Sequence, residues 1–227
     1  TFAVNLYATE NVLTTGNAFV HSISTGGEGT GKGDTITIGS GGTDSLTTGT
    51  RNDTVVTTTG YAMSISTNGG ADNVTIGSGG SFSVQTGNGN DTVTTGDGSV
   101  EAISTGLGRD TVAIGAGGAD LVKTSDGNDT VTTGTGYVQL IHTGNGNDVV
   151  EVGSGAGAIV KLGQGDDVVT VNEINPAYGL VIQGGEGKDT IDFSKFTTGV
   201  TFTLDSSGIF QNVAAPGGDL TVPAKGY

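Results

Sequence analysis

The sequence predicts an all-β fold, a parallel β-solenoid whose 19-residue coils each hold two short strands and two glycine-rich turns. Three observations predict it. An aspartate recurs with a 19-residue period through most of the chain, columns of valine and isoleucine keep the same period, and 44 of the 227 residues are glycines at equally regular positions. A helical interpretation fails, because no apolar 3.6-residue period survives so much glycine and threonine.

The aspartate column defines the repeat. Its first eight members keep the 19-residue spacing, and a ninth follows at a slightly longer interval: Asp34, Asp53, Asp72, Asp91, Asp110, Asp129, Asp148, Asp167 and Asp189. Self-similarity at a fixed period is typical of repeat proteins, in which each coil is stable only against its neighbours.

Apolar residues follow each aspartate at two, four and twelve positions, with polar residues between the first two columns. The column at two positions comprises Ile36, Val55, Val74, Val93, Val112, Val131, Val150, Val169 and Ile191. This alternation is typical of short strands. Stacked coils place equivalent residues about 4.8 Å apart, so the columns predict a narrow, continuous core. The same stacking predicts a supporting ladder from the threonines Thr48, Thr67, Thr86, Thr105, Thr124 and Thr143.

Departures from the period divide the chain. We expect an N-terminal cap or edge strand over residues 1–10, regular coils over 11–171, an irregular last coil over 172–195 and a C-terminal capping segment over 196–227. Asn11 stands where the first aspartate is expected, four extra residues lie in Gly26–Gly33, and Pro176 breaks the last coil. Four of the seven phenylalanines, Phe193, Phe196, Phe202 and Phe210, fall near the C-terminus.

Composition excludes several classes of protein. The formal charge is −15, from 23 acidic and 8 basic residues, which argues against a nucleic-acid partner or an anionic membrane surface. The chain has no cysteine for disulfides and no long apolar run for membrane insertion. It starts at Thr1 without a signal peptide, so we expect it to be cut from a longer protein. No Ser/His/Asp or Cys/His set is apparent, and we expect no enzymatic activity.

The turn before each aspartate carries the chemistry. Residues 184–192 match the repeat G-G-x-G-x-D-x-U-x in full, where U is a large apolar residue. Related turns supply further glycines whose backbone carbonyls are candidate ligands: Gly87, Gly89, Gly106, Gly108, Gly144, Gly146, Gly163, Gly165, Gly184, Gly185 and Gly187. Ca²⁺ takes six to eight oxygen ligands in flexible geometry. The nine aspartates and these carbonyls therefore predict about eight calcium ions in one file along one edge.

Electrostatics leads to the same prediction. Carboxylates about 4.8 Å apart repel by about 1 kcal/mol per neighbouring pair even in water. Eight divalent ions would move the net charge to about +1. We therefore expect the metal-free chain to be largely unfolded and to fold as calcium binds.

These turns resemble the RTX repeats of bacterial proteins exported by type I secretion, over residues 11–195. The resemblance implies a secreted, extracellular or cell-surface location, and a structural module of a large adhesin or surface-layer protein that contacts calcium, neighbouring domains and a cell-surface partner. The opposite edge lacks a consistent acid, since Asp44 and Asp120 share their column with Met63, Phe82, Gln139 and Ala158. Within the aspartate edge, Arg51, Asn68 and Ser125 replace turn glycines.

Two alternatives stay open. A one-sided, 19-residue coil is similar to the ice-binding repeats of a very large bacterial adhesin, in which threonine and asparagine point outward from the calcium turn. The matching candidate ice-facing residues are Thr50, Asn52, Asn88, Asn90, Asn145 and Asn147, and Leu107, Arg109, Asp126 and Asp166 interrupt their ranks. The other alternative is the non-catalytic tail of a secreted protease, lipase or epimerase.

Overall fold

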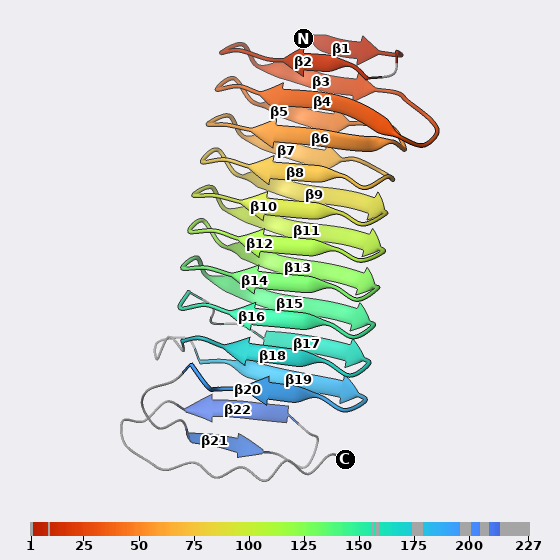
Figure 1. Ribbon diagram of the computed structural model, residues 1–227. Coiled ribbons are helices and arrows are strands. Elements are labelled where there is room, and N and C mark those ends of the chain that lie inside the picture. Colours follow the sequence, from red (N-terminus) through yellow and green to blue (C-terminus); the bar gives the residue numbers. More distant parts are fainter. Residues whose placement is uncertain are drawn as a thin grey trace.

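The computed structural model is an elongated stack of β-strands that wind from one end to the other (Figure 1). It describes residues 2–8, 10–155, 157, 159–173, 179–195, 201–204 and 209–213, the last two ranges by their backbone only. Strands and turns make up this described part, and no helix in it has the length and hydropathy needed to cross a membrane.

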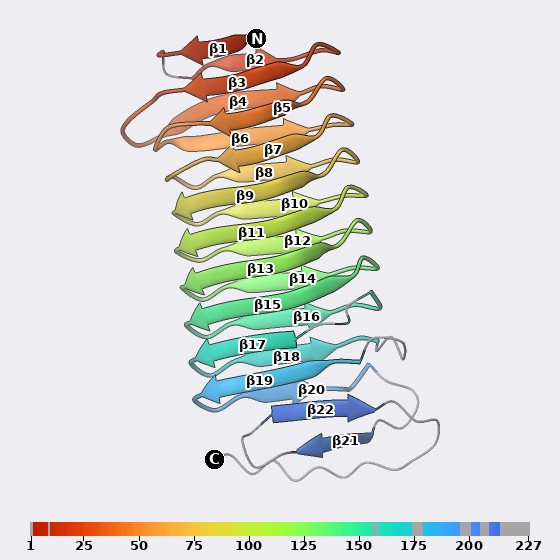
Figure 2. The same cartoon turned by 180° about the vertical axis from the view of Figure 1, so that it is seen from behind.

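Two sheets face each other across the stack, and each coil contributes one strand to each of them (Figure 2). The first sheet has twelve strands in the order β1 (Ala3–Leu6), β3 (Val20–Thr25), β5 (Thr43–Thr47), β7 (Ala62–Ser66), β9 (Ser81–Asn88), β11 (Val100–Leu107), β13 (Ala119–Asp126), β15 (Val138–Asn145), β17 (Ile159–Gln164), β19 (Val181–Glu186), β22 (Ile209–Val213) and β21 (Thr201–Leu204). The second has ten strands in the order β2 (Val12–Thr14), β4 (Lys32–Ile38), β6 (Asn52–Thr57), β8 (Asn73–Ile76), β10 (Thr92–Thr95), β12 (Thr111–Ile114), β14 (Thr130–Thr133), β16 (Val149–Val152), β18 (Val168–Val171) and β20 (Thr190–Asp192).

The register of the sheets follows the sequence period. Successive coils pair in parallel, so that Val93 lies between Val74 and Val112, its equivalents one repeat before and one repeat after it. The predicted fold class, an all-β parallel solenoid with two strands per coil, is therefore confirmed.

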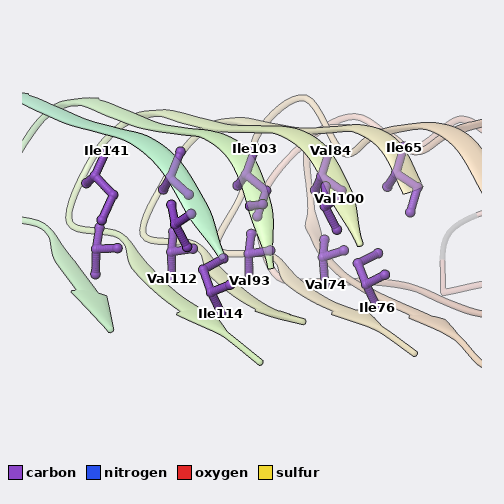
Figure 3. Packing of buried hydrophobic residues seen from close by; sticks show 14 of the residues in the cluster. Ile65, Val74, Ile76, Val84, Val93, Val100, Ile103, Val112, Ile114 and Ile141 are labelled. Carbon is purple, nitrogen blue, oxygen red and sulfur yellow. The ribbon is translucent and has the colours of Figure 1, made fainter. Parts of the chain in front are cut away.

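The core is a set of ladders between the two sheets (Figure 3). Val74, Val93 and Val112 from one sheet meet Val84 and Ile103 from the other, and all five are fully buried. Each coil contributes only a few side chains to this narrow core, so a coil alone would leave its apolar surface in water.

The two ends of the stack differ. At the N-terminal end β1 is an edge strand that pairs with β3, in parallel. At the other end β22 pairs with β19 in antiparallel orientation, and β21 pairs with β22. An antiparallel strand ends the parallel stacking of this sheet. Pro176, Ala158, Phe196 and residues 214–227 of the expected cap lie outside the described residues.

A second period of two coils is superimposed on the first. In the column four residues after the aspartate, buried threonines alternate with aliphatic residues: Thr15, Ile38, Thr57, Ile76, Thr95, Ile114, Thr133 and Val152. Each of these threonines accepts a hydrogen bond from the N–H of a glycine in the next coil, as Thr57 Oγ1 does from Gly77 at 3.0 Å. The turns that follow alternate as well, since Gly42, Gly80 and Gly118 have positive φ in every second coil. The sequence analysis missed this alternation.

The turn glycines on the aspartate edge are sterically required. Gly108 has φ of +131°, and a Cβ there would overlap the carbonyl oxygen of Gly89. We expect Gly108→Ala to lower the free energy of unfolding by roughly 2 kcal/mol, measured by urea unfolding followed by circular dichroism. Gly26→Ala is the control, because a Cβ at Gly26 meets no atom within 4 Å. Equal unfolding midpoints for the two variants would contradict this account of the turn.

Candidate metal centre

The aspartate column lies along one edge of the solenoid, on the right in Figure 1. Each aspartate follows the turn that leads from a strand of the twelve-stranded sheet to the next strand of the ten-stranded sheet, as Asp91 does between β9 and β10. From Asp34 to Asp167 the side chains are 0–3% exposed, and Asp189 is partly buried. The repeat therefore buries one carboxyl group per coil.

One oxygen of each carboxylate links two coils. Oδ1 of Asp110 accepts a hydrogen bond from the backbone N–H of Asp91, at 2.8 Å. The same bond recurs along the whole column, from Asp53, which accepts from Asp34 at 2.6 Å, to Asp189, which accepts from Asp167 at 3.2 Å. Hydrogen bonds to an ionised acceptor are short and strong, so the column fixes the register of the stack.

The other oxygen has no partner. Oδ2 is buried and accepts no hydrogen bond in seven consecutive coils, at Asp53, Asp72, Asp91, Asp110, Asp129, Asp148 and Asp167. A buried acceptor without a donor is costly, and more so when it carries charge. Because the coils are in register, these seven atoms form a row of oxygens, and each of them could accept a ligand in the same way.

Burial raises the pKa of these carboxyl groups. The pKa of Asp72 rises to about 7, chiefly because burial disfavours its charge, while the nearby Thr67 hydroxyl, which donates to the Thr86 carbonyl, and the Asp53 N–H lower it and the charges of Asp91 and Asp53 raise it again. Burial is also the largest cause for Asp110 and Asp167, whose pKa values rise to about 6. The pKa shifts upward, with burial as the first cause, at Asp53, Asp91, Asp129, Asp148 and Asp189.

The candidate carbonyl ligands lie beside these carboxylates, some in the turns and some in the last residues of the strands before them. Those in turns are Gly89, Gly108, Gly146, Gly165 and Gly187, and those in strands are Gly87, Gly106, Gly144, Gly163, Gly184 and Gly185. All but Gly184 of the eleven predicted glycines have positive φ, between 97° and 144°. A Cβ at Gly184 would overlap Oδ2 of Asp189. Asn68 and Ser125, which replace glycine, also have positive φ, at 65° and 81°.

Turn carbonyls remain open as acceptors. None of the backbone hydrogen bonds found in the turns of the described chain ends on the carbonyl of Gly89, Gly108, Gly127 or Gly146. These four turns thus pair an orphaned carboxylate oxygen with at least one open carbonyl each.

Such oxygens fit calcium. They are hard donors, the aspartate edge offers no sulfur, and Ca²⁺ accepts carboxylates and backbone carbonyls together. No group of three or more His, Cys, Asp or Glu side chains lies close enough to hold a metal within the described residues. An ion here would therefore take most of its ligands from the main chain, and would supply positive charge between neighbouring carboxylates.

Buried threonines flank the aspartates on the other side of each turn. Thr86 Oγ1 donates to the carbonyl of Thr105 in the next coil at 3.2 Å, and the bond recurs at Thr48, Thr67, Thr124 and Thr143. The predicted threonine ladder is confirmed at these positions, whereas Thr105 Oγ1 makes no such bond to the next coil and lies near the carboxylate of Asp110. Sequence reasoning missed the Oδ1 bonds, because spacing alone does not show which way a carboxylate turns.

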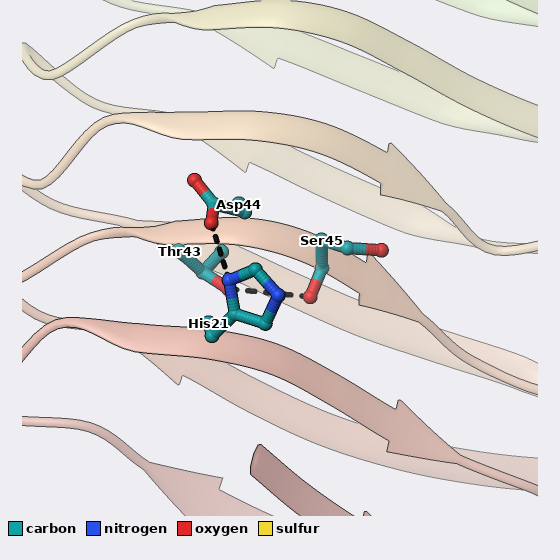
Figure 4. Close-up of polar contacts among 4 residues, drawn as sticks. All are labelled: His21, Thr43, Asp44 and Ser45. Carbon is teal, nitrogen blue, oxygen red and sulfur yellow. Dashed lines mark hydrogen bonds and ion pairs between the residues drawn. The ribbon is translucent and has the colours of Figure 1, made fainter. Parts of the chain in front are cut away.

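The opposite face has a different acid. Asp44 Oδ2 lies 2.6 Å from Nδ1 of His21 in the preceding coil (Figure 4), and this is the one ion pair found in the described part of the chain. Beside it, Thr43 Oγ1 donates to the carbonyl of Ser45 at 3.2 Å. The pair is partly exposed and lies away from the aspartate column, so it adds nothing to the candidate centre.

The raised pKa values predict an unusual pH dependence for the metal-free chain. Between an unfolded pKa near 3.8 and the folded values of about 6 to 7, the folded state binds more protons, so the free energy of unfolding falls as pH rises. In chelator we expect β-structure to be more stable at pH 4.5 than at pH 7.5, measured as the thermal midpoint by circular dichroism. Asp72→Asn should flatten this dependence. A midpoint that rises with pH in chelator would contradict the assignment.

Comparison with protein-family models, with curated proteins and with solved structures found no match to this chain.

Proposed function

We propose that this chain is a calcium-stabilised structural module, a solenoid whose coils are cross-linked by ions held between neighbouring turns of the aspartate edge. The observation that carries the proposal is the row of seven buried Oδ2 atoms without hydrogen-bond partners. A solvated turn aspartate would leave these atoms in water, and a purely structural hydrogen-bond ladder would leave them paired.

The chemistry of the ligands supports calcium over other ions. The gaps between the later turns offer carboxylate and carbonyl oxygens, and the charge of the whole chain is −15. Extracellular calcium modules bind with dissociation constants of about 10⁻⁴ to 10⁻³ M, which matches a secreted or surface location. In this proposal the module extends or stiffens a larger adhesin-type or surface-layer protein and performs no catalysis.

The proposal predicts opposite effects of one substitution with and without calcium. Asp110→Asn retains an Oδ1 acceptor for the Asp91 N–H but removes the charge of the orphaned carboxylate. We expect the calcium midpoint for gain of β signal to rise about tenfold (~1.4 kcal/mol), whereas residual structure in chelator should increase. The measurement is calcium titration by circular dichroism.

Asp97→Asn is the matched control, because Asp97 is exposed on the other edge and its loss changes the net charge equally. If the two substitutions have equal effects, the shift in the calcium midpoint comes from the change in net charge and not from the orphaned carboxylate of Asp110. Ordered β-structure in excess chelator at neutral pH, unaltered by calcium, would refute the proposed function.

A second candidate function is binding to ice, and one surface favours it. We define the threonine face as the outward side of β2 to β14 in the ten-stranded sheet, with two residues per coil: Val12, Thr14, Thr35, Thr37, Thr54, Val56, Asn73, Thr75, Thr92, Thr94, Thr111, Ala113, Thr130 and Thr132. These fourteen positions carry no charge and no aromatic ring, and threonine side chains are stiff at χ1. A regular array of methyl and hydroxyl groups suits a flat, uncharged, periodic ligand.

The residues first predicted to face ice are less suited to it. Oδ1 atoms of Asn52, Asn90 and Asn147 accept hydrogen bonds from backbone N–H groups of the next coil, at 2.8–2.9 Å. Thr50 Oγ1 accepts from Gly29, and Asn145 donates to Asp126. These bonds hold neighbouring turns in register and orient the side chains along the stack.

Ice binding is tested by a charge on the threonine face. If the candidate function holds, the calcium-loaded protein should shape ice crystals and lower the freezing point below the melting point, and Thr94→Lys should abolish most of this gap. Lys in place of Gln85, on the outward side of the other sheet, should not. Absence of any thermal hysteresis in the calcium-loaded protein would remove this function and leave the structural one.

A further inference from the structure

The first gap of the aspartate edge is built differently from the others. It lies between the loop that joins β3 to β4 and the turn before Asp53, and its loop is visibly larger than the later turns (Figure 1). The interval from Asn11 to Asp34 exceeds the regular repeat, so the loop holds four extra residues. Arg51 stands two residues before Asp53, where the corresponding residues of the later turns are glycines with positive φ, such as Gly70 and Gly89.

The side chain of Arg51 reaches back across this gap. Its Nε donates to the carbonyl of Glu28 at 3.1 Å, and a terminal nitrogen donates to the carbonyl of Thr30 at 3.3 Å. The guanidinium also packs on Gly29, where a Cβ would lie 3.3 Å from it. The carbonyls of Glu28 and Thr30 thus bind the positive charge of the Arg51 side chain in this gap.

Two more carbonyls of the loop are also used as acceptors. The N–H of Thr50 donates to the carbonyl of Gly27 at 2.8 Å, and that of Asn52 donates to Gly31 at 3.1 Å. In later turns, by contrast, the carbonyls of Gly89 and Gly108 accept no such bond. The first gap therefore retains the orphaned Oδ2 of Asp53, but four of its loop carbonyls, those of Gly27, Glu28, Thr30 and Gly31, already accept hydrogen bonds. This leaves fewer oxygens toward the six to eight that calcium takes.

We infer that Arg51 closes the first gap as a resident cation, so that the file holds about seven calcium ions instead of eight and begins at Asp72. This inference rests on the proposed function for its ion count. The Arg51 contacts themselves need no metal, because the guanidinium keeps its charge at any pH at which the protein folds. The N-terminal coils would then hold their register independently of calcium concentration.

Counting bound ions tests the inference. We expect equilibrium dialysis with metal analysis to give seven calcium ions per chain at saturation. A variant with a regular first turn, R51G with residues 26–33 replaced by Gly-Asn-Gly-Asn, should bind eight. Eight ions in the unaltered chain, or seven in the folded variant, would overturn the assignment.

Hydrogen exchange tests the clamp without relying on the count. In saturating calcium, Arg51→Ala should speed exchange of the Gly29, Thr50 and Asn52 amides about tenfold. Arg109→Ala is the control, since the Arg109 side chain is exposed and its loss changes the charge equally. Equal exchange in the two variants would overturn the role of Arg51. A chain that binds no calcium would refute the proposed function, yet the exchange of these amides would still show whether Arg51 holds the loop.

Discussion

The structure depends on burying one carboxyl group per coil in strict register. A carboxylate inside a protein needs donors or counter-charge on both oxygens, and here Oδ1 has a donor while Oδ2 has none. The hydrogen bond through Oδ1 aligns each coil with the one before it. The unmatched Oδ2 makes the same alignment unfavourable unless protons or cations are present, so the feature that specifies the fold also makes it conditional.

Other features of the aspartate edge follow from this constraint. Glycines with positive φ let the turn backbone pass close to the preceding coil without overlap. Threonines on the far side of the turn donate their hydroxyl hydrogens to carbonyls of the next coil, as Thr86 does to Thr105. They therefore flank the carboxylates and leave the row of Oδ2 atoms open. The core between the sheets is thin and adds little per coil. The stability of the solenoid is therefore the sum of small contributions from the individual coils. The charge state of the aspartate edge determines whether that sum favours the folded stack.

The sequence predicted the coil length, the two strands per coil, the core columns and the aspartate edge, because each follows the same unbroken period. It did not predict the Oδ1 ladder, since spacing does not determine side-chain rotamers. It also missed the pairing of His21 with Asp44, because the long loop between them puts the two residues out of period. The sequence showed Arg51 only as a replacement for a turn glycine. Its contacts with Glu28 and Thr30 could not be predicted, because they depend on the path of the loop in space.

The alternation of Thr57, Ile76, Thr95 and Ile114 has a consequence for how such a chain can change in length. A threonine in this column bonds to the glycine of the following coil, and the aliphatic residue of that coil is followed by a different turn. Deleting or duplicating a single coil would place two like turns in contact and leave a buried hydroxyl or an amide mismatched. From Thr15 to Val152 the repeating unit of this column is therefore the coil pair, and the alternation ends there, because Val171 follows Val152 in the next coil.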